Sequence, residues 1–321
     1  MKIREGNRPG TAHLVPSDTG AELVVTGLEP EELAAAFGQG RWPRTWARER
    51  NIRVELPGPE SSAAEPAAPA APSLERAFED GTVSLFTGRP AQVRVAPTDE
   101  EPEFPMPKCL MVAIAHQWAR LGRMTLHAAA IEYQGTGLLA LGRSGAGKTT
   151  LSLAAIAAGG RIVSDDWVML REENGALLCT SLRDRLLVRT SDASQTLLHQ
   201  VGGRLKAGKK TPDKRWFDGR AGELMRGKMH CGAIVALRQE DPRPDQSNFE
   251  RLKPASLYSE ILNATSALLM SNRLATEAAA LQRLARQLNR LPSVSMTGGK
   301  DVTEVPIGTC DRLAQALSAS Q

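Results

Sequence analysis

The stretch LLALGRSGAGKTTLSLAAIAAGGRIVSDDWVM, residues 138–169, contains the most specific pattern in the chain. Residues 142–149 fit G-x-x-x-x-G-K-[ST], the pattern of a loop that binds nucleotide phosphates. The apolar run at 138–141 predicts a strand before this loop, and residues 149–158 predict a helix after it. Gly159-Gly160 ends that helix, and residues 161–164 predict a second short strand. Strands and a helix around a phosphate loop predict an α/β fold.

The loop residues suit contact with phosphate. The three glycines let the backbone curl so that N–H groups point at phosphate oxygens, and the helix N-terminus adds a positive dipole end. Lys148 would reach the β- and γ-phosphates, and Thr149 would place its hydroxyl on Mg²⁺. Arg143 and Ser144 would face solvent or contact the substrate. The expected nucleotide-binding residues are Gly142, Arg143, Ser144, Gly145, Ala146, Gly147, Lys148, Thr149 and Thr150.

Two adjacent carboxylates, Asp165 and Asp166, follow the strand at 161–164. In phosphate-loop proteins, an acidic residue at the end of the neighbouring strand holds Mg²⁺. One aspartate is enough for this role, so the second suits another task, such as accepting a proton from an attacking hydroxyl. The alternative interpretation is an acidic turn without chemistry.

Upstream, residues 125–130 predict a strand that carries His127, and Gly135-Thr-Gly137 turns the chain into the strand at 138–141. This order, followed by the phosphate loop, helix, Gly-Gly and Asp-Asp, resembles the C-terminal kinase domain of HPr kinase/phosphorylase and related bacterial serine kinases. It is more remotely similar to ATP-dependent phosphoenolpyruvate carboxykinase. The match covers residues 126–170. The chain most resembles divergent members that modify peptides, including lasso-peptide precursors.

The resemblance implies a P-loop kinase domain with mixed sheets and flanking helices, which phosphorylates a hydroxyl with ATP and Mg²⁺. It assigns Lys148 to phosphate binding and Thr149 to the metal. It gives Asp165 and Asp166 metal ligation and general-base work, with Asp165 as ligand and Asp166 as base the favoured assignment; the reverse stays open. His127 matches the family's active-site histidine, beside the transferring phosphate. A lone histidine on an apolar strand is otherwise a hydrogen-bonded core residue.

The sequence predicts a small α+β N-terminal domain at 1–56, a Pro/Ala-rich linker at 57–73, and the catalytic domain at 74–321. In the first domain, residues 22–26 and 52–56 predict strands and residues 30–37 a helix. A hairpin at 82–95 and a helix at 108–121 follow the linker. Residues 230–237 predict one buried strand.

Composition limits the function classes. The chain has 321 residues, 41% of them hydrophobic, which is enough for a sizeable core. Its four cysteines form no metal-ligand spacing. The sequence has no apolar run that would predict a transmembrane helix and no apolar signal segment near residue 1, so we expect a cytoplasmic protein without membrane contact. The net charge of +4 does not indicate a nucleic-acid partner.

Residues 202–220, GGRLKAGKKTPDKRWFDGR, combine basic residues with glycines and lack periodicity, which predicts a mobile loop. Three interpretations remain: a solvated surface; a lid that brings Lys209, Lys210, Lys214 or Arg215 over the γ-phosphate; or a docking patch for an acidic peptide or nucleic acid.

The leading function is therefore phosphoryl transfer from ATP to a hydroxyl, either a Ser/Thr of a peptide or protein or a small molecule. A nucleotide-binding switch or ATPase without transfer is the alternative class. A homo-oligomer is compatible with the resemblance, since family members are often oligomeric.

Overall fold

The structure is a computed structural model of the 321-residue chain. It describes residues 2–6, 11–15, 22–37, 52–56, 72, 74–78, 81–86, 92–97, 108–182, 185–189, 191–201, 206–210, 214–218, 227–265 and 275–320. Apart from Pro72, the expected linker at 57–73 lies outside these residues.

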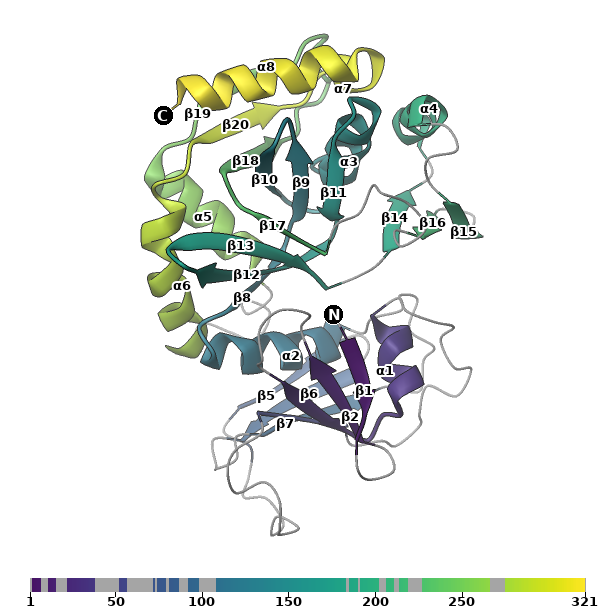
Figure 1. Ribbon diagram of the computed structural model, residues 1–321, viewed down its shortest axis with the longest axis vertical. Coiled ribbons are helices and arrows are strands. Elements are labelled where there is room, and N and C mark those ends of the chain that lie inside the picture. The colour runs from purple at the N-terminus through teal and green to yellow at the C-terminus, as the bar shows by residue number, and fades with distance from the viewer. Residues whose placement is uncertain are drawn as a thin grey trace. The chain divides into compact units, whose positions relative to one another are not determined.

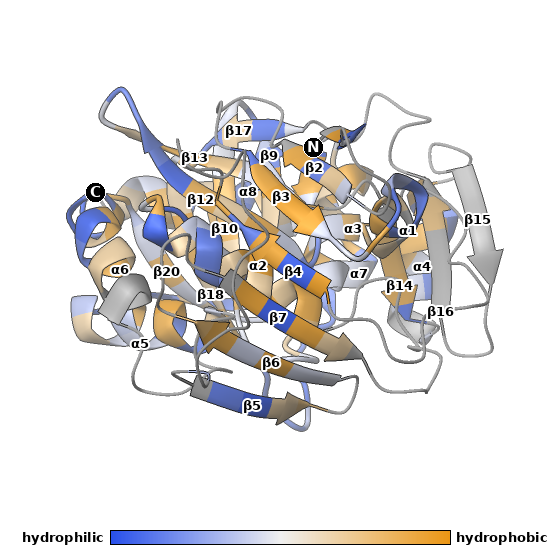
Figure 2. Ribbon diagram, turned by 90° about the horizontal axis from the view of Figure 1, so that it is seen from below, coloured by the Kyte–Doolittle hydropathy of each residue, from blue (hydrophilic) through white to orange (hydrophobic). Residues whose placement is uncertain are grey.

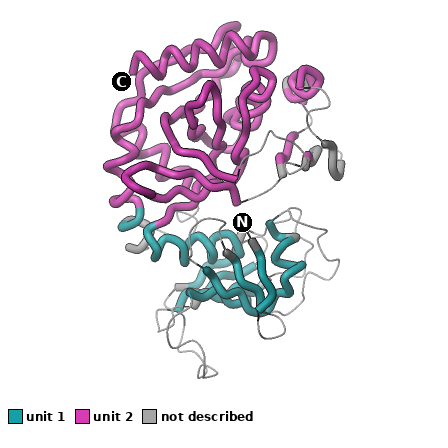
Figure 3. Tube along the Cα trace, in the orientation of Figure 1, with its two compact units in different colours: residues 1–122, 269–280 teal, residues 123–268, 281–321 magenta. Residues whose placement is uncertain are grey.

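The chain divides into two compact units, drawn in two colours in Figure 3. Unit 1 consists of Met1–Gly122 and Leu269–Ala280, and unit 2 of Arg123–Leu268 and Leu281–Gln321. The boundary thus lies near residue 122 rather than at the expected position before residue 74. The physical reason is strand pairing, because Ile52–Glu55, before the linker, pairs with Gln92–Pro97, after it.

Unit 1 is an antiparallel sheet with two helices. Its seven strands lie in the order β1-β2-β3-β4-β7-β6-β5. Figure 2 shows apolar and polar residues alternating along β4 and β7, the pattern of strands with one face against a core. The strands are β1 (Lys2–Glu5), β2 (Thr11–Val15), β3 (Leu23–Thr26), β4 (Ile52–Glu55), β5 (Leu74–Phe78), β6 (Gly81–Phe86) and β7 (Gln92–Pro97), and the helices are α1 (Pro30–Ala36) and α2 (Lys108–Arg120).

Helix α2 covers this sheet through contacts with β4, β6 and β7. Trp118 is fully buried on it, and the Gln117 Nε2 donates a hydrogen bond to Val54 O at 2.9 Å. The helices at 30–37 and 108–121 and the hairpin at 82–95 are therefore confirmed, within a sheet that the sequence analysis divided between two domains.

The described residues of unit 2 form three sheets, and their strands are labelled in Figure 1. The six-stranded sheet has the order β11-β9-β10-β18-β20-β19, with β10, β18 and β20 parallel. Its strands are β9 (Ala129–Tyr133), β10 (Thr136–Leu141), β11 (Arg161–Ser164), β18 (Ala233–Arg238), β19 (Asn248–Arg251) and β20 (Ser293–Thr297). The four-stranded sheet consists of β17 (Lys228–His230), β13 (Ala176–Ser181), β12 (Trp167–Glu173) and β8 (Met124–His127). The three-stranded sheet consists of β14 (Arg185–Arg189), β16 (Lys214–Asp218) and β15 (Lys206–Lys210).

Both faces of the six-stranded sheet are buried, which explains the unbroken apolar run on β10. Leu138 and Ala140 join a core cluster with α3 (Lys148–Ala157) and α8 (Pro306–Ala319). Leu139 and Leu141 join a second cluster with the four-stranded sheet, α5 (Pro254–Ala264) and α6 (Ala275–Leu288). The remaining helices are α4 (Asp192–Val201) and α7 (Asp301–Glu304). The expected α/β class is confirmed as a mixed α/β fold with several sheets and flanking helices.

Among the described residues, the chain crosses between the four- and six-stranded sheets at Ala128, at the pair Asp165–Asp166 and at the pair Cys231–Gly232. The single strands expected at 125–130 and 230–237 are therefore wrong, since each is two strands in different sheets. At the third crossing the backbones are close: Gly232 N donates to Gly137 O at 2.8 Å, and a Cβ on Gly137 would lie 2.0 Å from His230 O.

The basic segment at residues 202–220 also differs from the expectation of a mobile loop. Its described residues form β15 and β16, which pair with each other, and β16 pairs with β14. Phe217 explains this, because it is 4% exposed and shares a core cluster with Leu186 and Val188 of β14. Phe217 therefore anchors β16, whose charged residues conceal the apolar pattern typical of a strand.

Among the residues that the structure describes, no helix combines the length and apolarity needed to cross a membrane.

Candidate active site

The glycine loop, residues 142–147, connects β10 to α3. Gly145 and Gly147 have φ angles of 86° and 101°, in the left-handed region that glycine adopts without strain. Gly147 is the residue before the first turn of α3. The expected strand, glycine loop and helix are thus present, and the loop has the curled backbone that the pattern predicts.

Lys148 is buried at the start of α3, with 6% of its surface exposed. Its Nζ donates hydrogen bonds to Gly142 O at 2.7 Å and to Arg143 O at 3.1 Å, so its side chain folds back along the loop. Burial lowers the pKa of Lys148, while the negative charges of Asp166 and Asp165 act in the opposite direction. The ammonium group therefore lies within electrostatic reach of both aspartates.

The two aspartates occupy the crossing between β11 and β12, and their surroundings differ. Asp165 is 5% exposed, and its Oδ2 accepts a hydrogen bond from Leu187 N of β14 at 3.1 Å. Asp166 is half-buried, and its Oδ1 lies 3.2 Å from His127 Nε2. The adjacent carboxylates are therefore held by different partners and suit different tasks.

His127 is the last residue of β8, next to the first crossing. It is directly opposite Trp167 in the antiparallel pairing of β8 and β12, and the two rings stack with centroids 5.7 Å apart. Ala128 N donates to Asp166 O at 2.9 Å, which joins the two crossings. The pairing thus fixes His127 beside Asp166, and the histidine is half-buried rather than a residue of the core.

Lys148, Asp165, Asp166 and His127 lie near one another, since the charges of both aspartates act on Lys148 and Asp166 contacts His127. We call this group the acid–lysine cluster. Arg143 and Ser144 are exposed in the glycine loop, whereas Gly142 is half-buried. The remaining loop residues, with Thr150, line a pocket that is described below.

The sequence analysis missed Trp167 and Leu187, which position His127 and Asp165. It also missed the pocket residues Arg238, Gln239 and Arg243, which lie beyond the apolar part of β18. Ligands of open α/β sheets bind at the carboxyl ends of parallel strands, so the residues after this strand could have been predicted.

Magnesium fits the donor set offered by Thr149, Asp165 and Asp166, because Mg²⁺ prefers oxygen ligands and retains several waters. Within the described part of the chain, no three His, Cys, Asp or Glu side chains group as a ready metal site. A metal ion that is held by one or two carboxylates together with substrate phosphates does not require such a group.

The chain matches no known protein-family profile and no curated protein sequence. Among solved structures it is similar to the Hpr(Ser) kinase/phosphatase from Coxiella burnetii, with 15% sequence identity and a TM-score of 0.33. The similarity covers 61% of this chain and 93% of that chain. A similarity of this size carries no functional weight, so the site has to be interpreted from its own geometry.

Proposed function

We propose that the protein is an ATP- and Mg²⁺-dependent phosphotransferase that moves the γ-phosphoryl group to a hydroxyl. The observation that carries the proposal is the acid–lysine cluster beside the curled glycine loop. A buried ammonium group, two carboxylates with different partners and a curled glycine loop are the parts that phosphoryl transfer requires. We further propose a P-loop kinase fold of the HPr kinase type for unit 2.

The glycine loop would bind the β- and γ-phosphates through its N–H groups and the positive end of α3. Lys148 would exchange its bonds to Gly142 O and Arg143 O for phosphate oxygens. The added negative charge would offset the cost of burying its ammonium group. Mg²⁺, held by Thr149 and Asp165, would neutralise charge on the phosphates during transfer.

Asp166 would accept the proton of the attacking hydroxyl. It is more exposed than Asp165, and it lies beside His127, so an incoming acceptor can reach it. His127, stacked on Trp167, would hold the Asp166 carboxylate in place. These roles agree with the favoured assignment of Asp166 as the base and Asp165 as the metal ligand.

The proposed acceptor is a Ser or Thr of a peptide or protein. The test is incubation of the protein with Mg²⁺, a cell extract and ATP that carries radioactive phosphorus at its γ-position. Dialysis then separates labelled macromolecules from labelled small molecules, and an Asp166→Asn variant gives the background. We expect acid-stable label in the protein fraction. Label in a small metabolite would change the acceptor class, and release of free phosphate alone would contradict transfer.

A further inference from the structure

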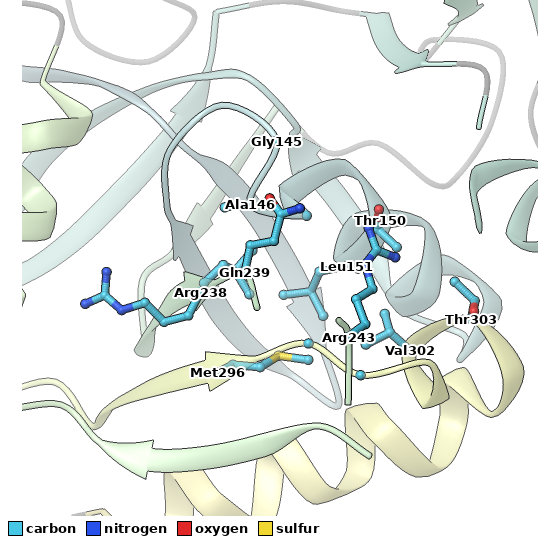
Figure 4. A pocket seen from close by; sticks show the side chains of 14 residues that line it. Gly145, Ala146, Thr150, Leu151, Arg238, Gln239, Arg243, Met296, Val302 and Thr303 are labelled. Carbon is cyan, nitrogen blue, oxygen red and sulfur yellow. The ribbon is translucent and has the colours of Figure 1, made fainter. Parts of the chain in front are cut away.

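A pocket lies against the glycine loop, and Figure 4 shows its side chains. The space between its walls is about 460 Å³, a volume that includes open solvent. Gly145, Ala146 and Gly147 of the loop form one wall, together with Thr150 and Leu151 of α3. The opposite walls come from the ends of β18 and β20 and from α7. The pocket therefore lies at the carboxyl ends of parallel strands, where α/β sheets bind ligands.

The pocket and the acid–lysine cluster use different residues. None of Lys148, Asp165, Asp166 and His127 is among the described residues that line the pocket. The Lys148 side chain points back to Gly142 and Arg143, at the start of the glycine loop, whereas the pocket begins at Gly145. A ligand that contacts both would have to extend along the loop.

The floor of the pocket is apolar and its rim is polar. Leu151, Leu237, Met296 and Val302 line it and are each at most 6% exposed. The exposed side chains Gln239 and Arg243 and the half-buried Thr303 lie at its rim. An apolar floor with a few polar groups suits a flat, partly polar molecule that is buried on one face.

Arg243 is the distinctive group at the rim. Figure 4 shows its side chain extending in the direction of Thr150, the residue that follows the loop's Lys-Thr. Within the part of the chain that the structure describes, its guanidinium group has no hydrogen-bond or ion-pair partner. Arg238, by contrast, pairs with Glu260. A planar cation without a protein partner is suited to stack on an aromatic ring or to pair with phosphate.

The backbone around Arg243 is held in position by a buried network. Lys300 N donates to Pro244 O at 3.0 Å, and the Asp301 Oδ1 accepts from Ser247 N and Oγ at 2.9 and 2.7 Å. The approach is close at Gly299, where a Cβ would lie 2.5 Å from Gln246 C. The rim is thus built in advance of any ligand, which lowers the entropic cost of binding.

We propose that this pocket binds the base and sugar of the nucleoside triphosphate, with Arg243 stacked on the base. This inference rests on the proposed function, since it assumes that the phosphates occupy the glycine loop. The apolar floor accepts one face of the base, and the Arg243 guanidinium covers the other. The phosphate chain then runs along the loop toward Lys148.

The hydroxyl acceptor is the competing occupant of the pocket. Its reacting oxygen has to meet the γ-phosphate near Asp166 and His127, whose side chains do not line the pocket. The nucleoside is at the opposite end of the triphosphate from the γ-phosphate. Its position therefore fits a pocket separated from the acid–lysine cluster along the glycine loop.

The test compares binding of ATP and of inorganic tripolyphosphate, both with Mg²⁺, by isothermal titration calorimetry. The proteins are the wild type, Arg243→Ala, and Arg251→Ala as a matched control, because Arg251 is exposed on β19 outside the pocket. We expect Arg243→Ala to weaken ATP binding by about 10-fold, the upper part of the range for a cation–π contact. Its affinity for tripolyphosphate should stay unchanged, and Arg251→Ala should resemble the wild type.

Other outcomes separate the two proposals. Equal weakening of both ligands, or no weakening of ATP, by Arg243→Ala would overturn the nucleoside pocket. A wild type that binds tripolyphosphate as tightly as ATP would also overturn it and leave the phosphate site standing. A wild type that binds neither ligand would contradict the proposed function itself. As an independent measurement, irradiation with 8-azido-ATP should label the peptides around Arg243 or Thr303, and label confined elsewhere would contradict the pocket.

Discussion

The acid–lysine cluster and the proposed nucleoside pocket adjoin the same glycine loop, but their charged side chains differ in burial. In the cluster, Lys148 and Asp165 are buried and depend on fixed partners. At the pocket, charged side chains are exposed above an apolar floor. Buried charges interact strongly but tolerate little change, whereas exposed ones contribute less and can be replaced. The comparison suggests that substitutions in the cluster affect catalysis severely, and those at the pocket mainly affect affinity.

Lys148→Ala should lower activity the most. A small effect would contradict the difference between the buried charges of the cluster and the exposed charges of the pocket. It removes the buried cation, so we expect kcat/KM for ATP to fall by about 10³-fold or more, the loss typical of one preorganised charge-stabilising donor. ATP·Mg should also no longer raise the Tm of the variant. Steady-state kinetics and thermal denaturation with and without ATP·Mg check this. An unaltered Tm increase in the variant would show that the nucleotide binds elsewhere.

Asp166→Asn should separate chemistry from binding within the cluster. It removes a base but keeps most phosphate contacts, so we expect transfer to fall by about 10² to 10⁴-fold. The Kd for ATP·Mg should change only a few-fold, since the amide keeps the shape of the side chain. Turnover close to that of the wild type would show that Asp166 is not the base, and Asp165→Asn should then be measured in the same way.

His127→Ala should lower kcat less than Asp166→Asn does, because His127 acts through its 3.2 Å contact with Asp166. We expect kcat to fall by about 10-fold, a modest part of the loss that misplacement of a reacting group causes, with the Kd for ATP unchanged. The matched control is His230→Ala, since His230 is exposed on β17. A loss as large as that of Asp166→Asn would give His127 a direct part in the transfer.

The smallest effect concerns which nucleobase the pocket accepts. A nucleobase held by stacking and by an apolar floor makes few hydrogen bonds to the protein. The Kd values for ATP and GTP should therefore differ by no more than about 10-fold. Competition titration of the two nucleotides measures this directly. A preference of several hundred-fold for one nucleotide would mean that backbone or side-chain groups at the pocket rim form hydrogen bonds with the edge of the nucleobase.

The residues around the glycine loop were largely predictable because one continuous stretch contains them. The strand, loop, helix and Asp–Asp crossing follow in order at 138–166, and each has its own local pattern. Asn174-Gly175, a residue pair typical of two-residue hairpin turns, likewise joins β12 to β13, with φ angles of 52° and 79°. Local sequence thus determined local geometry, and the cluster followed from it.

The complete set of pocket residues was not predictable, because no continuous stretch of the chain contains it. Its walls come from α3, from β18, and from β20 with the adjacent α7, three regions that are far apart in the chain and share no motif. The strand breaks at Ala128 and Cys231–Gly232 were also hidden, because buried apolar residues continue through each break. These are Leu126, Ala128 and Ala129 at the first break, and Met229, Cys231 and Ala233 at the second. A continuous apolar run reveals burial but not which sheet each half joins.

The crossings have a mechanical consequence. His127 and Trp167 belong to paired strands of the four-stranded sheet, whereas Lys148 follows a strand of the six-stranded sheet. A change in the dihedral angle between these sheets would move the histidine and its neighbouring acid together, relative to the ammonium group. Core substitutions between the sheets, remote from every reacting atom, would therefore tune turnover while leaving each side chain of the site intact.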